Sequence, residues 1–174
     1  MASVLQKKDI QSLGNDEIDA VFRQSKCIRF SRILETSPKN NIPDLYPGDM
    51  VVVNIQSDMD EQGNPLPGKH WVCCGKISNH SAWYFDSFGL APPKQVIQAL
   101  HVPLKKIKYA ENQIQDNDSG TCGWFCILAC TMFDRCRGNM KKISDTFYKI
   151  TQLFDSPNLE TNDDILFDCL NHTL

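Results

Sequence analysis

The stretch that decides the fold is HWVCCGKISNHSAWYFD, residues 70–86. Two apolar runs, 70–77 and 82–85, flank the polar tetrapeptide Ser78-Asn79-His80-Ser81, and this arrangement predicts a β-hairpin. The start of one strand lies beside the end of its antiparallel partner, so the hairpin places Asp86 near His70. A carboxylate there can orient an imidazole base and stabilise its cation. The alternative is that Asp86 only begins a turn.

Helices are predicted on both sides of this hairpin. Upstream, Asn15-Asp16-Glu17 resembles a helix start, and the run 50–55 is a β-branched strand. Downstream, a short helix follows Pro92-Pro93, and two later segments carry apolar residues spaced for one helix face. Another strand is predicted at 106–109. Helices at both ends of a strand-rich middle predict a single α+β domain over residues 1–174.

Cys122 is a candidate nucleophile. A helix is predicted from about Cys122 to Arg137, with capping residues in 118–121 and Gly138 as its end. The amino end of a helix stabilises a thiolate, and Gly123 favours a tight junction between loop and helix. The alternative is a core cysteine.

Two further cysteines, Cys126 and Cys130, continue the spacing of Cys122 on one helix face. We expect these two to be small buried thiols that pack the core. A zinc site would need a fourth ligand in suitable geometry, so no metal is predicted. The chain has eight cysteines, and we expect them to be mostly reduced.

An oxyanion donor is predicted in the polar segment before Cys122. The side-chain amide of Gln115 could act with the backbone N–H of Cys122. Gln113 competes with it, because two residues apart in an extended segment share one face. Spacing to the cysteine favours Gln115. The other histidines, His80, His101 and His172, are expected on the surface, the last two without a matching acid.

Composition excludes several classes of protein. The net charge of −3 gives no general nucleic-acid footprint, and the basic clusters at 105–108 and 135–142 are interpreted as solvated element ends. The longest apolar runs fall short of the roughly 18 residues of a membrane span. Residues 1–8 lack the apolar stretch of a signal peptide, so we do not expect secretion or a membrane.

The order His70, Asp86, Gln115, Cys122 resembles that of the adenain-like cysteine proteases, the adenovirus endopeptidase group and its SUMO-protease relatives. His70-Trp71 is similar to a histidine–tryptophan pair of that group. The segment 84–89, YFDSFG, resembles its aromatic-Phe-Glu-Pro-Phe-Gly, with Asp86 for Glu and Ser87 for Pro. SUMO proteases usually place Asp before the cysteine, and Thr121 here favours the viral branch.

The resemblance implies a papain-like fold, in which a mixed central sheet is flanked by helices and the nucleophile begins a helix. It implies a processing endopeptidase that cuts capsid or core precursors at glycine-containing sites, as in virophages and Polinton/Maverick elements. We therefore expect a monomer in the host cytoplasm, viral factory or virion. The resemblance implies that DNA or a peptide could act as an activator, as in adenain. The sequence itself requires no cofactor, DNA is not an expected partner, and activation by a peptide is left open.

Two residues are candidate substrate-binding positions. Trp71 is expected to line the cleft near glycine-sized subsites or, equally, to pack against the hairpin. Gly123, directly after Cys122, is the second candidate. The loops 36–49 and 57–69 are expected to shape specificity.

Two other functions compete with the endopeptidase hypothesis. One is an isopeptidase that removes ubiquitin-like modifiers, and the other is an inactive binding module with a vestigial site.

Overall fold

The computed structural model describes residues 12–25, 27, 30–36, 42–56, 69–154 and 157–173. Within these ranges the strands form one mixed sheet in the order β1-β2-β3-β4-β5. The β1–β2 and β4–β5 pairs are parallel, and the two pairs between them are antiparallel. The strands are β1 (Phe30–Thr36), β2 (Met50–Gln56), β3 (Lys69–Ser78), β4 (Ser81–Phe85) and β5 (Ile107–Lys108). The α+β prediction with a mixed sheet is confirmed.

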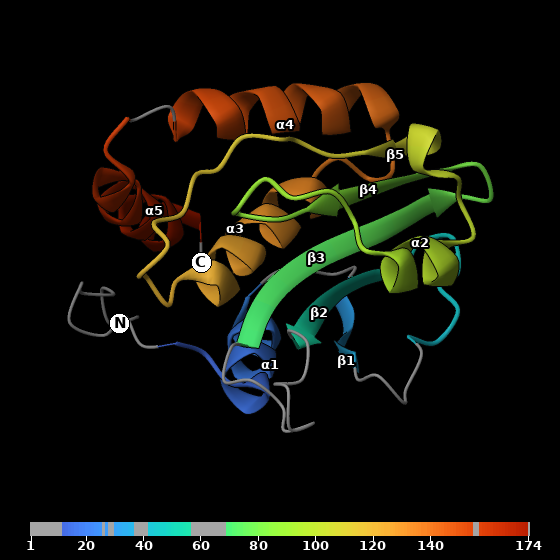
Figure 1. The fold of residues 1–174 in the computed structure, drawn as a ribbon, viewed down its shortest axis with the longest axis horizontal. Helices are drawn as coiled ribbons and strands as arrows, with labels where there is room; N and C mark the ends of the chain where they lie inside the picture. The colour runs from blue at the N-terminus through green and yellow to red at the C-terminus, as the bar shows by residue number, and fades with distance from the viewer. Residues whose placement is uncertain are drawn as a thin grey trace, which may run out of the picture.

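The predicted hairpin is formed by β3 and β4, which pair with Cys73 opposite Phe85. Its turn is closed by a hydrogen bond of 2.8 Å between the Ser78 and Ser81 hydroxyls. β3 is the central strand and pairs with β2 from Lys69 to Gly75. The curved β3 ribbon crosses the middle of the molecule in Figure 1, with β4 beside it. The residues that open β3 and follow β4 therefore meet at one end of the sheet.

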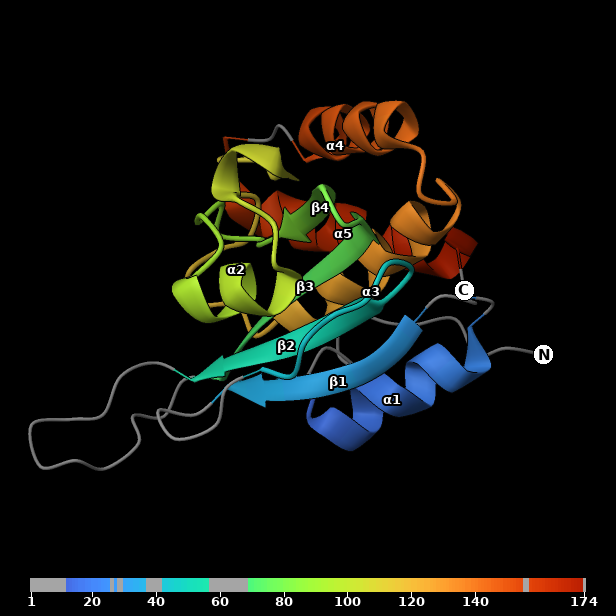
Figure 2. The ribbon, with the colours of Figure 1, turned by 90° about the vertical axis from the view of Figure 1, so that its right-hand side faces the viewer.

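Helices cover both faces of this sheet. One face packs against α3 and its neighbours, the other against α2 and the loops around it. Figure 2 shows α2 on one side of the strands and α3 with α5 on the other. The helices are α1 (Asn15–Gln24), α2 (Lys94–Leu100), the short 3₁₀ turn η2 (Leu104–Lys106), α3 (Cys122–Asp134), α4 (Met140–Leu153) and α5 (Leu159–Thr173).

The central helix is α3. Its residues 122–131 are all buried, which fits a sequence that is apolar on every side. The helix begins at Cys122 as predicted and ends at Asp134, slightly before the predicted Arg137. Gly138 follows with a φ of +71°, a left-handed conformation that favours glycine. The chain then turns back into α4, whose buried face carries Ile143, Phe147 and Ile150.

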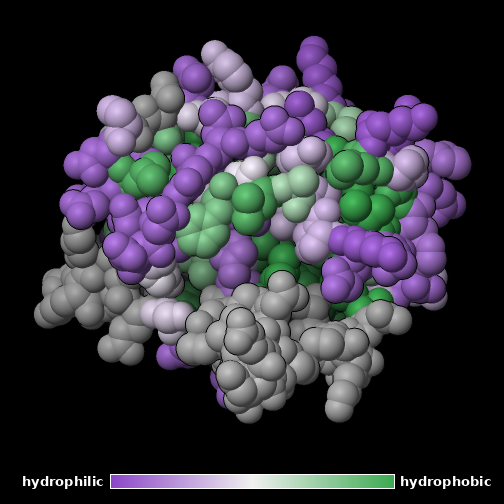
Figure 3. Space-filling view, viewed as in Figure 1, coloured by the Kyte–Doolittle hydropathy of each residue, from purple (hydrophilic) through white to green (hydrophobic). Residues whose placement is uncertain are grey.

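The surface drawn in Figure 3 is polar along its upper rim. Below the rim, small groups of hydrophobic residues lie among hydrophilic ones. In the described part of the chain, no helix combines the length and the apolar character that crossing a membrane requires.

Two parts of the sequence were not predicted well. Strand β1 was not expected, because its sequence FSRILET mixes charged and apolar residues without clear alternation. It forms because the edge of β2 offers it backbone partners. In the predicted loop 36–49, residues 42–49 are described and Gly48 has a φ of +100° in a turn. Residues 37–41 and 57–68 lie outside the described residues, so the predicted role of these loops in specificity stays a prediction.

Candidate active site

The hairpin brings His70 and Asp86 into contact. Cys73 pairs with Phe85. If this pairing continued toward the start of β3, His70 would lie opposite Phe88, and Asp86 would be the first residue beyond the end of β4. His70 Nε2 lies 2.8 Å from Asp86 Oδ1. The side chain of Asp86 is 2% exposed and that of His70 is 20% exposed. The carboxylate is thus held inside the protein, while one edge of the imidazole reaches solvent.

Two neighbouring residues, Tyr84 and Phe88, hold this pair through three contacts. The backbone N–H of Phe88 donates to Asp86 Oδ1 at 2.8 Å, and the Tyr84 hydroxyl donates to Oδ2 at 3.4 Å. Burial, followed by the charge of Asp86, raises the pKa of Tyr84, so its hydroxyl stays a donor. The Phe88 ring stacks on the His70 ring with centroids 4.6 Å apart. Both partners are therefore fixed in orientation.

The surroundings of His70 favour its charged form. Burial alone lowers the pKa of an imidazole, but hydrogen bonds with Asp86 and Cys122, and the charges of both, outweigh it. The net effect raises the pKa of His70 from 6.5 to about 9. At neutral pH His70 is therefore an imidazolium that donates from both ring nitrogens.

Cys122 lies near this imidazolium, because its thiol is one of the groups that raise the pKa of His70. The residue is 4% exposed. Because Nε2 is engaged with Asp86, Nδ1 is the ring nitrogen left for the sulfur. Cys122 is the first residue of α3, where backbone N–H groups lack partners within the helix. The chain thus unites the predicted base, acid and nucleophile.

One local expectation about this helix start is wrong. A capping side chain was predicted in 118–121, but the N-cap residue Thr121 has φ −90° and ψ 0° and makes no side-chain cap. Its hydroxyl instead donates to Asp163 Oδ1 on α5 at 3.0 Å and contacts the Ser119 hydroxyl at 2.7 Å. The residue before Cys122 is thus tied to α5.

Gln115 is buried close to the same loop. It is 1% exposed, its Oε1 accepts from the Ser87 hydroxyl at 2.5 Å, and its Nε2 donates to Ser119 O at 2.6 Å. The competitor Gln113 is exposed, and its Nε2 donates both to Gln115 O and to Asn117 Oδ1, each at 2.9 Å. Both hydrogens of the Gln113 amide are thus engaged. The arrangement favours Gln115 as the donor.

The two candidate substrate-binding residues, Trp71 and Gly123, are both buried. Trp71 is 0% exposed, and its indole N–H donates to Leu13 O at 2.9 Å, so the packing alternative is the one that the structure describes. A Cβ at Gly123 would lie 3.2 Å from Leu13 Cβ and 3.3 Å from Ile18 Cδ1. Gly123 therefore permits the close approach of Leu13 and Ile18, and its predicted contact with substrate stays a prediction.

The remaining cysteines near the site behave as packing residues. Cys73, Cys126 and Cys130 are at most 1% exposed and lie in one cluster between β3 and α3. Burial is the main cause that raises the pKa of Cys126 to about 11. All eight cysteines are free thiols, and the described residues contain no group of three or more side chains that could hold a metal ion. The core-packing prediction for Cys126 and Cys130 is confirmed.

The other histidines lie on the surface, as predicted, but one expectation about them is wrong. His101 does have an acid partner, because its Nε2 lies 2.8 Å from Asp44 Oδ1. Both side chains are more than half exposed, so the pair is solvated. His80 is in the exposed turn, and His172 bonds the backbone of its own helix at Asp168.

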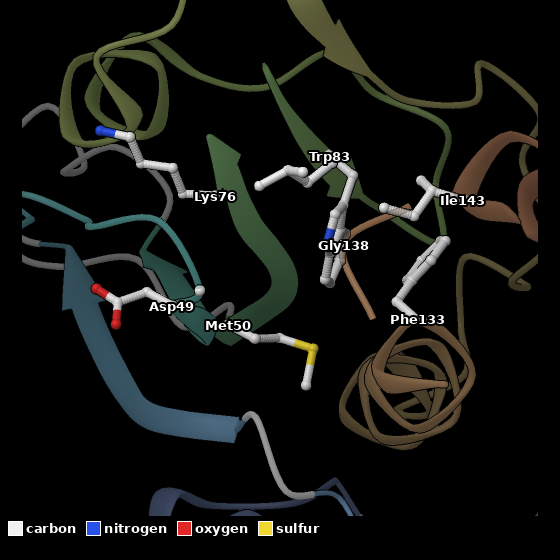
Figure 4. A pocket seen from close by; sticks show the side chains of 9 residues that line it. Asp49, Met50, Lys76, Trp83, Phe133, Gly138 and Ile143 are labelled. Carbon is white, nitrogen blue, oxygen red and sulfur yellow. The ribbon is translucent and has the colours of Figure 1, made fainter. Parts of the chain in front are cut away.

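A small pocket of about 40 Å³ lies far from this chemistry, near the carboxyl end of α3. Figure 4 shows Met50, Trp83, Phe133 and Ile143 lining it, with the Lys76 ammonium directed away from those side chains. The Trp83 and Phe133 rings are 4.3 Å apart. The lining combines these apolar side chains with Asp49 and Lys76, and so small a space between the sheet and the helices indicates imperfect packing.

Comparison with known proteins gives no family. No protein-family model matches this chain, and no curated protein matches it significantly.

Proposed function

We propose that this protein is a cysteine endopeptidase with Cys122 as nucleophile and His70 as general acid and base. The observation that carries the proposal is that His70 contacts a buried carboxylate and that its pKa is raised both by this carboxylate and by a thiol at a helix start. An imidazolium with a pKa of about 9 beside a thiol favours the thiolate, which is the reactive form of cysteine. The pair of His101 with Asp44 differs, because both of its side chains are more than half exposed.

The reaction follows from these positions. Cys122 Sγ forms a bond to the scissile carbonyl carbon, and the electron pair of the C=O bond moves to oxygen. The oxyanion is stabilised by the Cys122 backbone N–H and by Gln115 Nε2. His70 then transfers a proton to the leaving nitrogen as the C–N bond breaks, which leaves a thioester.

The second half regenerates the enzyme. Neutral His70 removes a proton from water, the hydroxide oxygen attacks the thioester carbonyl, and the C–S bond breaks. The carboxylic product departs, and Cys122 and His70 return to the thiolate and imidazolium. Asp86 keeps its hydrogen bond with His70 and stabilises the cation of that residue.

The fold and substrate belong to the same proposal. We propose a papain-like arrangement of the adenain type, with capsid or core precursors of a viral or transposon-like element as substrates. The supports are the α+β fold with a mixed sheet, the start of α3 at Cys122 and the order of the four residues along the chain.

The test compares wild type with Cys122→Ala and with Cys169→Ala. Cys169 is partly exposed and lies on α5, so its loss controls for removal of a thiol. Each protein is incubated with a peptide library and with a ubiquitin-like protein linked through a C-terminal Gly-Gly, and the products are identified by mass. We expect peptide cleavage by wild type and Cys169→Ala that is lost in Cys122→Ala.

Other results distinguish the rivals. Cleavage of only the Gly-Gly conjugate would replace the endopeptidase with an isopeptidase. Equal cleavage by all three proteins would show that Cys122 is not the nucleophile. No cleavage, together with slow alkylation of Cys122 by iodoacetamide at pH 7, would favour an inactive binding module.

A further inference from the structure

Ser87 makes a set of contacts that the proposed reaction does not yet use. It directly follows Asp86 and is 1% exposed. Its backbone carbonyl accepts from the N–H groups of Ile114 and Gln115 at 2.9 and 3.2 Å, and its hydroxyl contacts Gln115 Oε1 at 2.5 Å. One residue thus binds both the backbone and the side chain of the oxyanion-donor segment.

The hydrogen-bond partners of Gln115 determine which atom of its side-chain amide is the oxygen and which is the nitrogen. A backbone carbonyl can only accept, so the atom 2.6 Å from Ser119 O must be the amide nitrogen. The amide oxygen then faces Ser87, whose hydroxyl must be the donor. Reversing the amide would set two carbonyl oxygens against each other at Ser119. The orientation is therefore fixed from both sides.

One hydrogen on the amide nitrogen remains for the reaction. A carboxamide nitrogen carries two hydrogens, and among the described residues Ser119 O is the acceptor that Nε2 contacts. Ser119 is close to Cys122 in the chain, so the nitrogen is held against the loop that leads into the nucleophile. The second N–H is the group that an oxyanion would require.

We infer that Ser87 is a positioning residue that holds the Gln115 amide with its nitrogen presented for the oxyanion. The inference rests on the proposed function. Without the hydroxyl, Oε1 is a buried acceptor with no donor, and the amide is free to shift out of line. Ser87 stands where the resembling family has proline, which offers no hydroxyl, so this chain supplies the contact through its own residue.

The test measures kcat and KM separately. Ser87→Ala should lower kcat by roughly 10- to 100-fold, less than the ~10²–10³-fold cost of losing a whole donor. KM should stay near its wild-type value, because the contact forms with the oxyanion rather than with the bound substrate. Ser87→Thr retains a hydroxyl and should recover much of the rate. Ser81→Ala, which removes a serine–serine bond at the far end of the hairpin, is the control.

A double-mutant cycle separates positioning from a general structural effect. In a Gln115→Ala background, Ser87→Ala should cause no further loss of kcat. An equal loss of kcat in both backgrounds would overturn the inference. So would full activity of Ser87→Ala when the wild type is active. Either result would leave the endopeptidase proposal standing.

An NMR measurement distinguishes failure of the Ser87 inference from failure of the endopeptidase proposal. If wild type hydrolyses nothing, the side-chain NH₂ signals of Gln115 still report the contact. They should exchange slowly with water in wild type and Ser81→Ala, and shift and exchange faster in Ser87→Ala. Unchanged Gln115 signals in Ser87→Ala would refute the positioning role whether or not the protein is an enzyme.

Discussion

The rings of His70 and Phe88 stack with centroids 4.6 Å apart and planes inclined by 30°. The two residues would be opposite each other if the β3–β4 pairing continued past the end of β4. The chain turns after Phe85 instead, and this turn carries the Asp86 carboxylate to within 2.8 Å of the imidazole. The hairpin end thus supplies both the acid that charges His70 and the ring that fixes its plane.

Replacing Asp86 by Asn should lower the pKa of His70. The hydrogen bond with Asp86 is the largest of the effects that raise the pKa of His70 to about 9. In Asp86→Asn the pKa of His70 should therefore fall toward 6.5. The fraction of imidazolium at pH 7.5 falls with it, and kcat should drop by about 10²–10⁴-fold. The titration is followed by NMR of the His70 ring. Asp44→Asn, which alters the exposed pair with His101, is the control and should leave the His70 titration in place.

Substituting the two glutamines should identify the oxyanion donor. Gln115→Ala removes a buried amide that faces the Cys122 loop, so kcat should fall by about 10²–10³-fold with little change in KM. Gln113→Ala removes an exposed amide with both hydrogens already engaged, and should change kcat by only a few-fold. Steady-state kinetics on a cleaved peptide provides the comparison. The reverse ranking would transfer the donor role to Gln113.

Gly89 should tolerate alanine much less well than Gly48. Both have left-handed φ values, +69° and +100°. A Cβ at Gly89 would lie 2.7 Å from the backbone carbon of Asn112, whereas one at Gly48 would meet nothing within 4 Å. Backbone strain costs each variant about 1–2 kcal/mol, and Gly89→Ala should lose a further 1–3 kcal/mol through overlap. Urea unfolding of both variants measures the difference, and equal losses would refute the steric account.

The charge of His70 should make the unfolding free energy depend on pH. The folded pKa of about 9 exceeds the ordinary 6.5, so the folded state holds the proton more tightly. The stabilisation is complete below about pH 6.5 and is lost as the pH rises through about 9. At about 1.4 kcal/mol per pKa unit it is on the order of 3 kcal/mol. Urea unfolding from pH 6 to 10 should show a steeper decline for wild type than for His70→Gln, and parallel curves would contradict it.

The sequence predicted the hairpin and the helix start at Cys122 because both are local. Two apolar runs around a polar turn place His70 beside Asp86, and a polar loop before an apolar run places Cys122 at a helix start. Strand β1 could not be predicted from its own sequence, because the segment becomes a strand by pairing with β2. Trp71 was ambiguous, since its burial depends on Leu13, which is distant in the chain.

The supporting contacts of the site were also missed for a physical reason. Ser87 meets Gln115, and Thr121 meets Asp163, across long stretches of chain. A serine or threonine in a polar loop has many partners available, and only the packed structure selects one. The choice between Gln113 and Gln115 was open for the same reason.

The bond from Thr121 to Asp163 gives helix α5 a share in placing the nucleophile. A helix near the end of the chain is thereby tied to the residue that precedes Cys122. Events that loosen α5 from α3 disconnect this anchor while the β3–β4 hairpin stays paired. On gradual heating, hydrolysis should then decline before the sheet melts, so that catalytic activity reports the seating of a helix that holds none of the reacting groups.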